Sequence, residues 1–278
     1  MIELPEVFTL TRQLSEEVVG KRVEKVHPPS SEHKFCWFSG DVTQYDKMLQ
    51  GHEIVSVEGF GFYVEITFDH EIKLNIRDGV NVRLLTPKEN RPEKYQLLID
   101  FADSYSLLFT VAMYGGIQCG QGISDNVYYA KSRESISPLG EEFDEVYFKE
   151  LMSSVKSTMS AKAFLATEQR IPGIGNGVLQ DILLQAGIHP KRKIAGLSDA
   201  EKEKLFRAVK DILSKMASQG GRDTEKDLYG NAGGYQTMLS KKTVNKGCSF
   251  CGGAIERKAY MGGSVYYCLQ CQPYSDNR

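Results

Sequence analysis

The chain of 278 residues suits two domains and a small module, and its 41% hydrophobic and 25% charged residues exclude a fibrous or intrinsically disordered protein. No run approaches the ~18 apolar residues of a membrane helix, and the N-terminus lacks a secretory signal, so we expect a cytoplasmic protein with no membrane partner. The net charge of −2 divides into −10 over residues 1–150 and +8 over residues 151–278, which indicates a polyanionic partner unless the division is a chance feature of solvated surfaces.

The first half predicts one helix followed by strands. Pro5 suits a first helical turn, apolar residues recur at helical spacing up to Val18, and Gly20 is expected to end the helix. Residues 21–111 are expected to be β structure, because short runs rich in β-branched and aromatic residues alternate with turn sequences. Strands without helices between them indicate an antiparallel sandwich or barrel. The clearest runs are 54–57, 62–68, 72–76, 80–85, 96–101 and 107–111.

The second half predicts helices. Residues 137–140, Ser-Pro-Leu-Gly, are expected to form a linker. Residues 219–247 are glycine-rich and polar, and they predict a connector that is longer than a compact domain usually keeps without a function. Helical periodicity covers residues 144–155, 160–169, 176–186 and 198–218.

Four of the six cysteines lie close to the C-terminus in two Cys-x-x-Cys pairs separated by sixteen residues. Each pair directs two thiolates to one point, so the four predict one tetrahedral zinc ion held on a β-hairpin. Disulfides or redox dithiols are the alternative, which the expected compartment and the duplicated spacing disfavour. A closed four-cysteine site predicts structural zinc. The ligands are Cys248, Cys251, Cys268 and Cys271. Cys36 and Cys119 are expected to be packing residues.

A glycine-rich turn over residues 172–177 precedes the apolar helix that starts near residue 178. Its glycines, Gly175 among them, free backbone N–H groups to face an anion, and Asn176 is suited to cap the helix or to bind a phosphate. A basic run beside such amides is what a phosphate backbone needs, although a solvated face is the alternative. This run is Lys191, Arg192 and Lys193, after Ile188-His189-Pro190.

Three blocks of the sequence resemble the formamidopyrimidine-DNA glycosylase and endonuclease VIII family of base-excision enzymes. They are residues 3–7 (Glu-Leu-Pro-Glu-Val), residues 173–190, which resemble the helix–two-turns–helix element, and the four-cysteine finger. The resemblance implies a DNA-repair protein that acts as a monomer on damaged or abasic double-stranded DNA. It also implies an α+β multidomain fold: an N-terminal antiparallel β-sandwich with a flanking helix (1–136), a helix–two-turns–helix domain (137–240) and a zinc finger (241–278).

In this family, removal of the initiator methionine exposes a proline whose amine attacks C1′ of the damaged nucleotide, and the following glutamate assists proton transfer. Here Ile2 stands at the proline position, while Glu3 keeps the carboxylate. Because a bulky second residue usually preserves the initiator, we expect the terminal amine to belong to Met1. The catalytic candidates are therefore Glu3, Met1 and Ile2.

Other family positions also differ in this chain. Phe62 stands at the family's lysine and Gly263 at the arginine of the finger hairpin, and Ala112-Met113-Tyr114-Gly115 stands where the family has a basic pair before Phe-Gly. Arg77 is the remaining candidate to fill the space left by a flipped base. Four losses around one site predict changed or weakened chemistry.

Three functional hypotheses follow. The first is a divergent DNA glycosylase with abasic-site lyase activity through the Met1 amine. The second is a catalytically silent protein that recognises distorted or abasic DNA. A third is use of the scaffold to bind RNA or protein.

Overall fold

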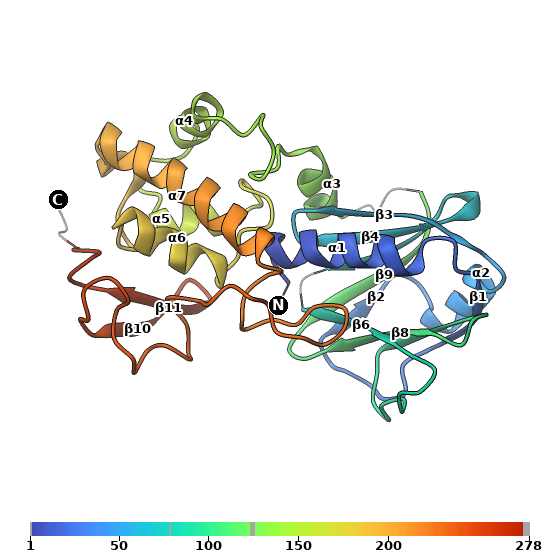
Figure 1. Ribbon diagram of the computed structural model, residues 1–278. Coiled ribbons are helices and arrows are strands. Elements are labelled where there is room, and N and C mark those ends of the chain that lie inside the picture. The colour runs from blue at the N-terminus through green and yellow to red at the C-terminus, as the bar shows by residue number, and fades with distance from the viewer. Residues whose placement is uncertain (1, 78, 123–125, 275–278) are drawn as a thin grey trace.

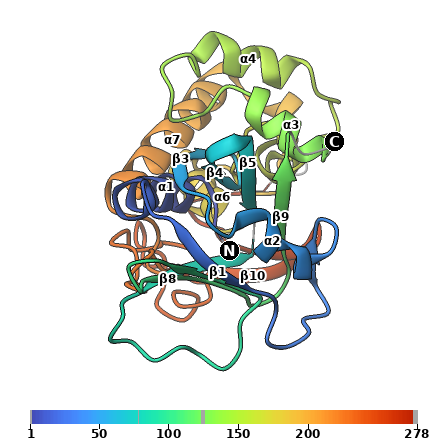
Figure 2. The ribbon, with the colours of Figure 1, turned by 90° about the vertical axis from the view of Figure 1, so that its right-hand side faces the viewer.

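The computed structural model describes residues 2–77, 79–122 and 126–274. Two β-sheets form one end of the molecule, helices form the other, and a β-hairpin lies beside the helices (Figure 1). Viewed from the sheet end, the two sheets form separate layers (Figure 2). Within the described ranges, no helix combines the length and the apolar character needed to cross a bilayer.

Helix α1 (Leu4–Val18) begins at a capping box in which Glu3 and Glu6 each bind the other's backbone, and Pro5 lies in its first turn. Its buried face packs on strand β3 (Ile54–Phe60). The helix ends just before Gly20, whose φ of +84° requires glycine, so the predicted helix and its end are confirmed.

Two sheets form the N-terminal sandwich. One has the strand order β1-β7-β8-β6 and the other β2-β9-β5-β4-β3. Their buried faces enclose one hydrophobic core, to which α1 also contributes. The remaining strands are β1 (Val23–His27), β2 (Cys36–Phe38), β4 (Tyr63–Phe68), β5 (Ile72–Arg77), β6 (Val80–Leu85), β7 (Leu97–Phe101), β8 (Ser106–Val111) and β9 (Gly115–Gln121).

Six strands match the runs expected from the sequence, but β9 lies beyond residue 111, where no strand is predicted. Its sequence, Gly-Gly-Ile-Gln-Cys-Gly-Gln, is poor in strand formers, and pairing with β5 and β2 on its two sides fixes it instead. The β2–β9 pair is parallel, unlike the antiparallel expectation, because a long connection separates the two strands. Helices α2 (Tyr45–Leu49) and α3 (Val127–Glu134) were also not predicted.

The predicted cysteine packing is confirmed. Cys119 is buried in the sandwich core, and Cys36 is half-buried against it. Burial raises the pKa of Cys36 to about 11 and that of Cys119 to about 12, so both remain thiols at neutral pH.

The helical half confirms the four predicted helices, with shorter bounds. Side chains accept hydrogen bonds at three of their starts: Asp144, Ser160 and Ser198. Leu4 of α1 packs in the core of these helices and not in the sandwich core. The helices are α4 (Glu145–Ser153), α5 (Ala161–Ala166), α6 (Val178–Ala186) and α7 (Asp199–Ser218).

The connector, residues 219–247, contains no helix or strand. It contributes side chains to the hydrophobic cores of the sandwich, the helical half and the finger. Leu228 is buried in the sandwich core, Tyr235 in the helical core, and Leu239 in the core of the finger. Asp181 of α6 accepts hydrogen bonds from the amides of Met238 (2.9 Å) and Leu239 (2.8 Å), while burial raises its pKa to about 6. The finger that follows is a hairpin of β10 (Ile255–Tyr260) and β11 (Gly263–Cys268).

Candidate functional site

The carboxylate of Glu3 lies where α1 meets the start of α6. It is 2% exposed and accepts hydrogen bonds from the amides of Gly175 (3.0 Å), Gly177 (2.8 Å) and Val178 (2.8 Å). A Cβ at Gly175 would lie 2.7 Å from Glu3 Cδ, so the turn needs glycine for this approach. The sequence motif therefore predicts an anion at these amides correctly, but the anion is the chain's own carboxylate.

Arg222 joins the carboxylates of Glu3 and Glu6. Its backbone N–H, Nε and Nη2 donate to Glu6 at 2.9, 3.0 and 2.7 Å, and its Nη1 lies 3.4 Å from Glu3 Oε1. Burial alone raises the pKa of Glu6, but the charge and hydrogen bonds of Arg222 outweigh it and hold that pKa below its usual range. Glu225 is 4.0 Å from Arg222, and burial raises its pKa.

A cavity of about 320 Å³ opens beside this cluster, and every part of the fold contributes to its lining. Arg222 and Gly177 connect the cavity to the Glu3 carboxylate, while Glu225 contributes a second acidic group. The other contributors are Tyr114 from the sandwich, Asn176 from the helical half, Lys241 from the connector and Gly263 from the finger.

Asn176 and the tip of the finger meet at the rim of this cavity. A Cβ on Gly263 would lie 2.8 Å from Asn176 Nδ2, so an arginine at this position would displace Asn176. Asn176 Oδ1 is buried without a hydrogen-bond partner among the described residues, and Asn176 does not cap α6. Arg257 of β10 donates to Ser264 Oγ at 3.2 Å and lies over the ring of Tyr266, both of which line the cavity.

The basic run after α6 is divided between two environments. Lys191 and Lys193 are exposed, and Lys191 Nζ lies 5.3 Å from the ring centroid of Tyr260 in the finger. Arg192 points to α7, where it donates to Gly196 O (3.0 Å) and pairs with Glu201 (3.2 Å). His189 is buried between two tyrosine rings, and burial lowers its pKa to about 4, so it adds no charge to the run at neutral pH.

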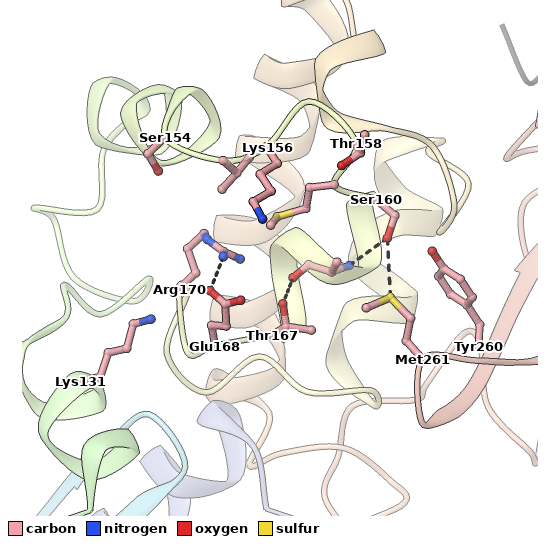
Figure 3. A pocket seen from close by; sticks show the side chains of 13 residues that line it. Lys131, Ser154, Lys156, Thr158, Ser160, Thr167, Glu168, Arg170, Tyr260 and Met261 are labelled. Carbon is pink, nitrogen blue, oxygen red and sulfur yellow. Dashed lines mark hydrogen bonds and ion pairs between the residues drawn. The ribbon is translucent and has the colours of Figure 1, made fainter. Parts of the chain in front are cut away.

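A second cavity, of about 660 Å³, also borders the finger tip (Figure 3). Three cations line it: Lys131 of α3, Lys156 between α4 and α5, and Arg170 after α5, the last paired with Glu168 at 2.8 Å. Tyr260 and Met261 of the finger close one side. Buried Lys162 holds this tip by donating to the carbonyl oxygen of Tyr260, and burial lowers the pKa of Lys162.

The other predicted site residues fall in different places. Ile2 is 2% exposed in the sandwich core, and Met1 lies outside the described residues. Arg77, at the end of β5, is half-buried, and its side chain lies over Gly116 of the neighbouring strand. Met113 is 65% exposed at the cavity mouth.

The four cysteines of the finger form a cluster that could bind a metal ion, because their sulfur atoms lie within 4.8 Å of one another. The Sγ atoms of Cys248 and Cys271 are 3.8 Å apart, and those of Cys251 and Cys268 are 3.5 Å apart. Sulfurs around a tetrahedral zinc ion, at a Zn–S distance of about 2.3 Å, are separated by about 3.8 Å. The donor set and its spacing therefore fit zinc.

Sequence reasoning missed Arg222, Glu225 and Arg257. The only local sign of Arg222 is Gly220-Gly221 before it, where Gly221 has a φ of +93° and lies against Glu6. Glu3 and Glu6, the carboxylates that Arg222 joins, are more than 200 residues away along the chain, so no local pattern connects them to Arg222.

Comparison with known proteins extends over almost the whole chain. Family models match residues 1–117 as a formamidopyrimidine-DNA glycosylase N-terminal domain and residues 135–227 as a formamidopyrimidine-DNA glycosylase H2TH domain. Formamidopyrimidine-DNA glycosylases of Carboxydothermus hydrogenoformans and Lactococcus lactis subsp. cremoris are each 28% identical over 98% of this chain and cover 100% and 99% of their own lengths.

Solved structures give the same result. The Lactococcus lactis protein in complex with DNA containing an abasic site superposes with a TM-score of 0.82 at 25% identity, over 98% of this chain and 100% of that one. With two domain models in the expected order and full-length similarity in both sequence and structure, this chain belongs to the formamidopyrimidine-DNA glycosylase and endonuclease VIII family.

Proposed function

We propose that this protein is a DNA-repair protein that binds damaged or abasic double-stranded DNA and whose glycosylase and lyase chemistry is weakened. The observation that carries the proposal is the Glu3 carboxylate, fixed by three amides and Arg222 beside a cavity that all parts of the fold line. Support comes from the relatives, which are named as DNA glycosylases, and from the Lactococcus lactis structure with abasic DNA.

The proposed reaction uses the amine of Met1. A terminal amine has a reference pKa of about 7.7–8.0, so a useful fraction is neutral at physiological pH. The neutral amine adds to the C1′ aldehyde of an abasic sugar, water leaves, and an imine forms. Glu3 is the proposed group for moving protons in this step, and Ile2, next to the residue that carries the amine, is buried in the sandwich core.

Attack on C1′ of an intact nucleoside is harder. The amine must come within about 3–3.5 Å of the carbon, and one additional residue displaces it by about 3.8 Å. Phe62 and Gly263 also supply no positive charge to hold the lesion phosphate or to favour the departing base. We therefore expect little excision of damaged bases and at most slow cleavage at abasic sites.

Proposed DNA contacts lie on the face that carries the finger tip. Lys191 and Lys193 are exposed there, partly buried Asn176 lines the cavity, and Arg77 remains the proposed void-filling residue. Gly175 and Arg192 support this surface indirectly, since the first donates to Glu3 and the second to α7. Lys131 and Lys156 add positive charge at the second cavity.

We propose that Arg257 takes the role of the arginine that the family carries at the position of Gly263. It reaches the cavity wall from the opposite strand of the hairpin, through Ser264 and Tyr266. The adjacent Lys258 alternates to the other face of β10, where it pairs with Glu256 at 3.6 Å. These two neighbouring cations therefore provide a functional residue and its matched control.

One zinc ion is the proposed occupant of the four-cysteine cluster. Four thiolates leave no open coordination position, so the ion would hold the hairpin in shape and take no part in the reaction. The hairpin in turn positions Gly263 and Arg257 at the cavity.

The proposed domain boundaries are 1–136, 137–240 and 241–278, and the family models match residues 1–117 and 135–227. A monomer in the cytoplasm, associated with the nucleoid when on DNA, is the proposed state. Bacterial relatives support this location.

A catalytically silent DNA-binding protein is the second candidate function. The observation in its favour is that four donors already occupy the oxygens of Glu3, which limits their availability to substrate. Borohydride trapping on DNA containing an abasic site distinguishes the two, alongside an intact-mass measurement that determines whether Met1 is kept. A trapped complex that Glu3→Gln abolishes without loss of DNA binding supports the enzyme. Binding without any trapped complex supports the silent protein.

A further inference from the structure

Two imidazoles and a carboxylate gather next to α2. Figure 1 shows α2 at the end of the sandwich that is remote from helices α4 to α7. His52 lies between α2 and β3, while Asp69 and His70 form the turn between β4 and β5. One ligand atom of each residue lies within 4.8 Å of the others. His52 Nδ1 is hydrogen-bonded to Asp69, and the centroids of the two histidine rings are 5.5 Å apart.

The backbone that presents His70 is unusual. His70 and Glu71 have φ values of 55° and 58°, a left-handed conformation that is unfavourable for residues with a Cβ. This turn directs the His70 ring to the His52–Asp69 pair. Among the described residues, no hydrogen bond or ion pair holds the ring of His70, whose ring contact is the edge-on one with His52.

Surrounding groups hold the carboxylate in place and leave the cluster accessible. The backbone N–H of Glu53 lies 3.4 Å from the second oxygen of Asp69, and Arg22 pairs with the side chain of Glu53 at 3.5 Å. The side chains of His52 and Asp69 are 28% and 37% exposed, which leaves room for water beside them.

We propose that His52, Asp69 and His70 bind one divalent transition-metal ion of the zinc type. Imidazole nitrogen suits zinc, copper and nickel better than magnesium or calcium, which prefer oxygen ligands. The ion would take the place of the proton between His52 and Asp69, and His70 would become its third protein ligand. The site is separate from the finger and from the proposed DNA surface.

The chain provides its own control for this proposal. His27 and Asp100 form a similar pair, with His27 Nε2 2.8 Å from the carboxylate and side chains that are 27% and 12% exposed. That carboxylate is already paired with Arg91, and no second imidazole accompanies it in the metal-ligand groups of the described residues.

The test measures zinc bound per chain by the full-length protein with its finger loaded, after equilibrium dialysis against increasing free zinc. We expect a second, saturable equivalent that raises the melting temperature. His52→Ala and His70→Gly should each weaken this equivalent at least tenfold, whereas His27→Ala should leave it unchanged. His70→Gly should also raise the melting temperature without added zinc, because glycine accepts the positive φ, while the zinc-dependent rise disappears.

The glycine variant therefore separates loss of a ligand from loss of the fold. The proposal is overturned if the chain binds a single zinc ion at all free zinc concentrations up to about 1 mM, which would place any second site above a dissociation constant of about 1 mM. It is equally overturned if His70→Gly binds the second ion as tightly as the original chain, or if His27→Ala loses it.

Discussion

Replacement of Arg222 by methionine is the most direct test of the Glu3–Glu6–Arg222 cluster. The three side chains are 2–4% exposed, so methionine would leave two carboxylates buried without their cation. Glu6 would lose its hydrogen bonds from Nε and Nη2 and keep only backbone donors. Removing one member of a buried ion pair costs about 3–5 kcal/mol, against a total stability of about 5–15 kcal/mol for a typical domain.

The assay is urea unfolding at equilibrium, with three comparison variants. Arg192→Met breaks a partly exposed pair with Glu201 and should cost less than about 1 kcal/mol. Arg222→Lys keeps the charge and should cost less than Arg222→Met. Adding Glu6→Gln to Arg222→Met should recover part of the loss, because it removes one of the uncompensated charges.

The change with pH in the stability cost of Arg222→Met provides an independent test of the cluster. In the original chain the pKa of Glu6 is lowered, so its contribution is present above its unfolded value of 4.5 and is lost as the pH falls through the folded value. Without Arg222, burial would raise that pKa, so the cost of Arg222→Met should shrink as the pH falls from 7 to 5. A cost below about 1 kcal/mol at pH 7, or one that grows on acidification, would refute this account of the cluster.

Four further predictions concern the finger, the DNA surface, the buried histidine and the catalytic chemistry. Cys251→Ser should abolish the structural zinc, measured by elemental analysis, and weaken DNA binding while far-UV circular dichroism shows the sandwich still folded. Arg257→Ala should weaken binding to abasic duplex DNA and lower the slope of log affinity against log salt by about 0.9, whereas Lys258→Ala should change neither. His189 has a folded pKa of about 4 against 6.5, so up to about 3 kcal/mol of stability should be lost between pH 6.5 and 4, and His189→Phe should flatten that loss in urea titrations. Ile2→Pro, which permits removal of Met1, should increase borohydride trapping; equal trapping would show that the terminal residue does not limit the chemistry.

Local physics made most elements predictable from the sequence. Pro5 marks the start of the first helix, helical periodicity marks four more helices, and runs rich in β-branched and aromatic residues mark six of the strands, because these signals lie within a few residues. Strand β9 and the short helix α2 lack such signals, and their neighbours in space determine them.

The candidate site likewise contains some features that local sequence predicts and others that depend on distant contacts. The glycine turn predicts an anion-binding site because free amides follow from local geometry. That the anion is Glu3, and that Arg222 completes the cluster, depends on contacts across more than 170 residues, which no single-sequence pattern contains. The four cysteines are predictable because their spacing alone brings the thiols together.

The connector couples the unfolding of the sandwich to the unfolding of the helical half. Separate hydrophobic cores ordinarily open independently, each at its own free energy. Here Leu228, Tyr235 and Leu239 place one covalent segment in all three cores, and Leu4 carries the first helix into the second of them. Loss of the sandwich core or of the helical core would expose apolar side chains of the other, so these two parts should melt as a single cooperative unit, whereas the small finger core opens separately when its metal ligands are removed. Amides from the sandwich and the helices should accordingly exchange with solvent at similar limiting rates.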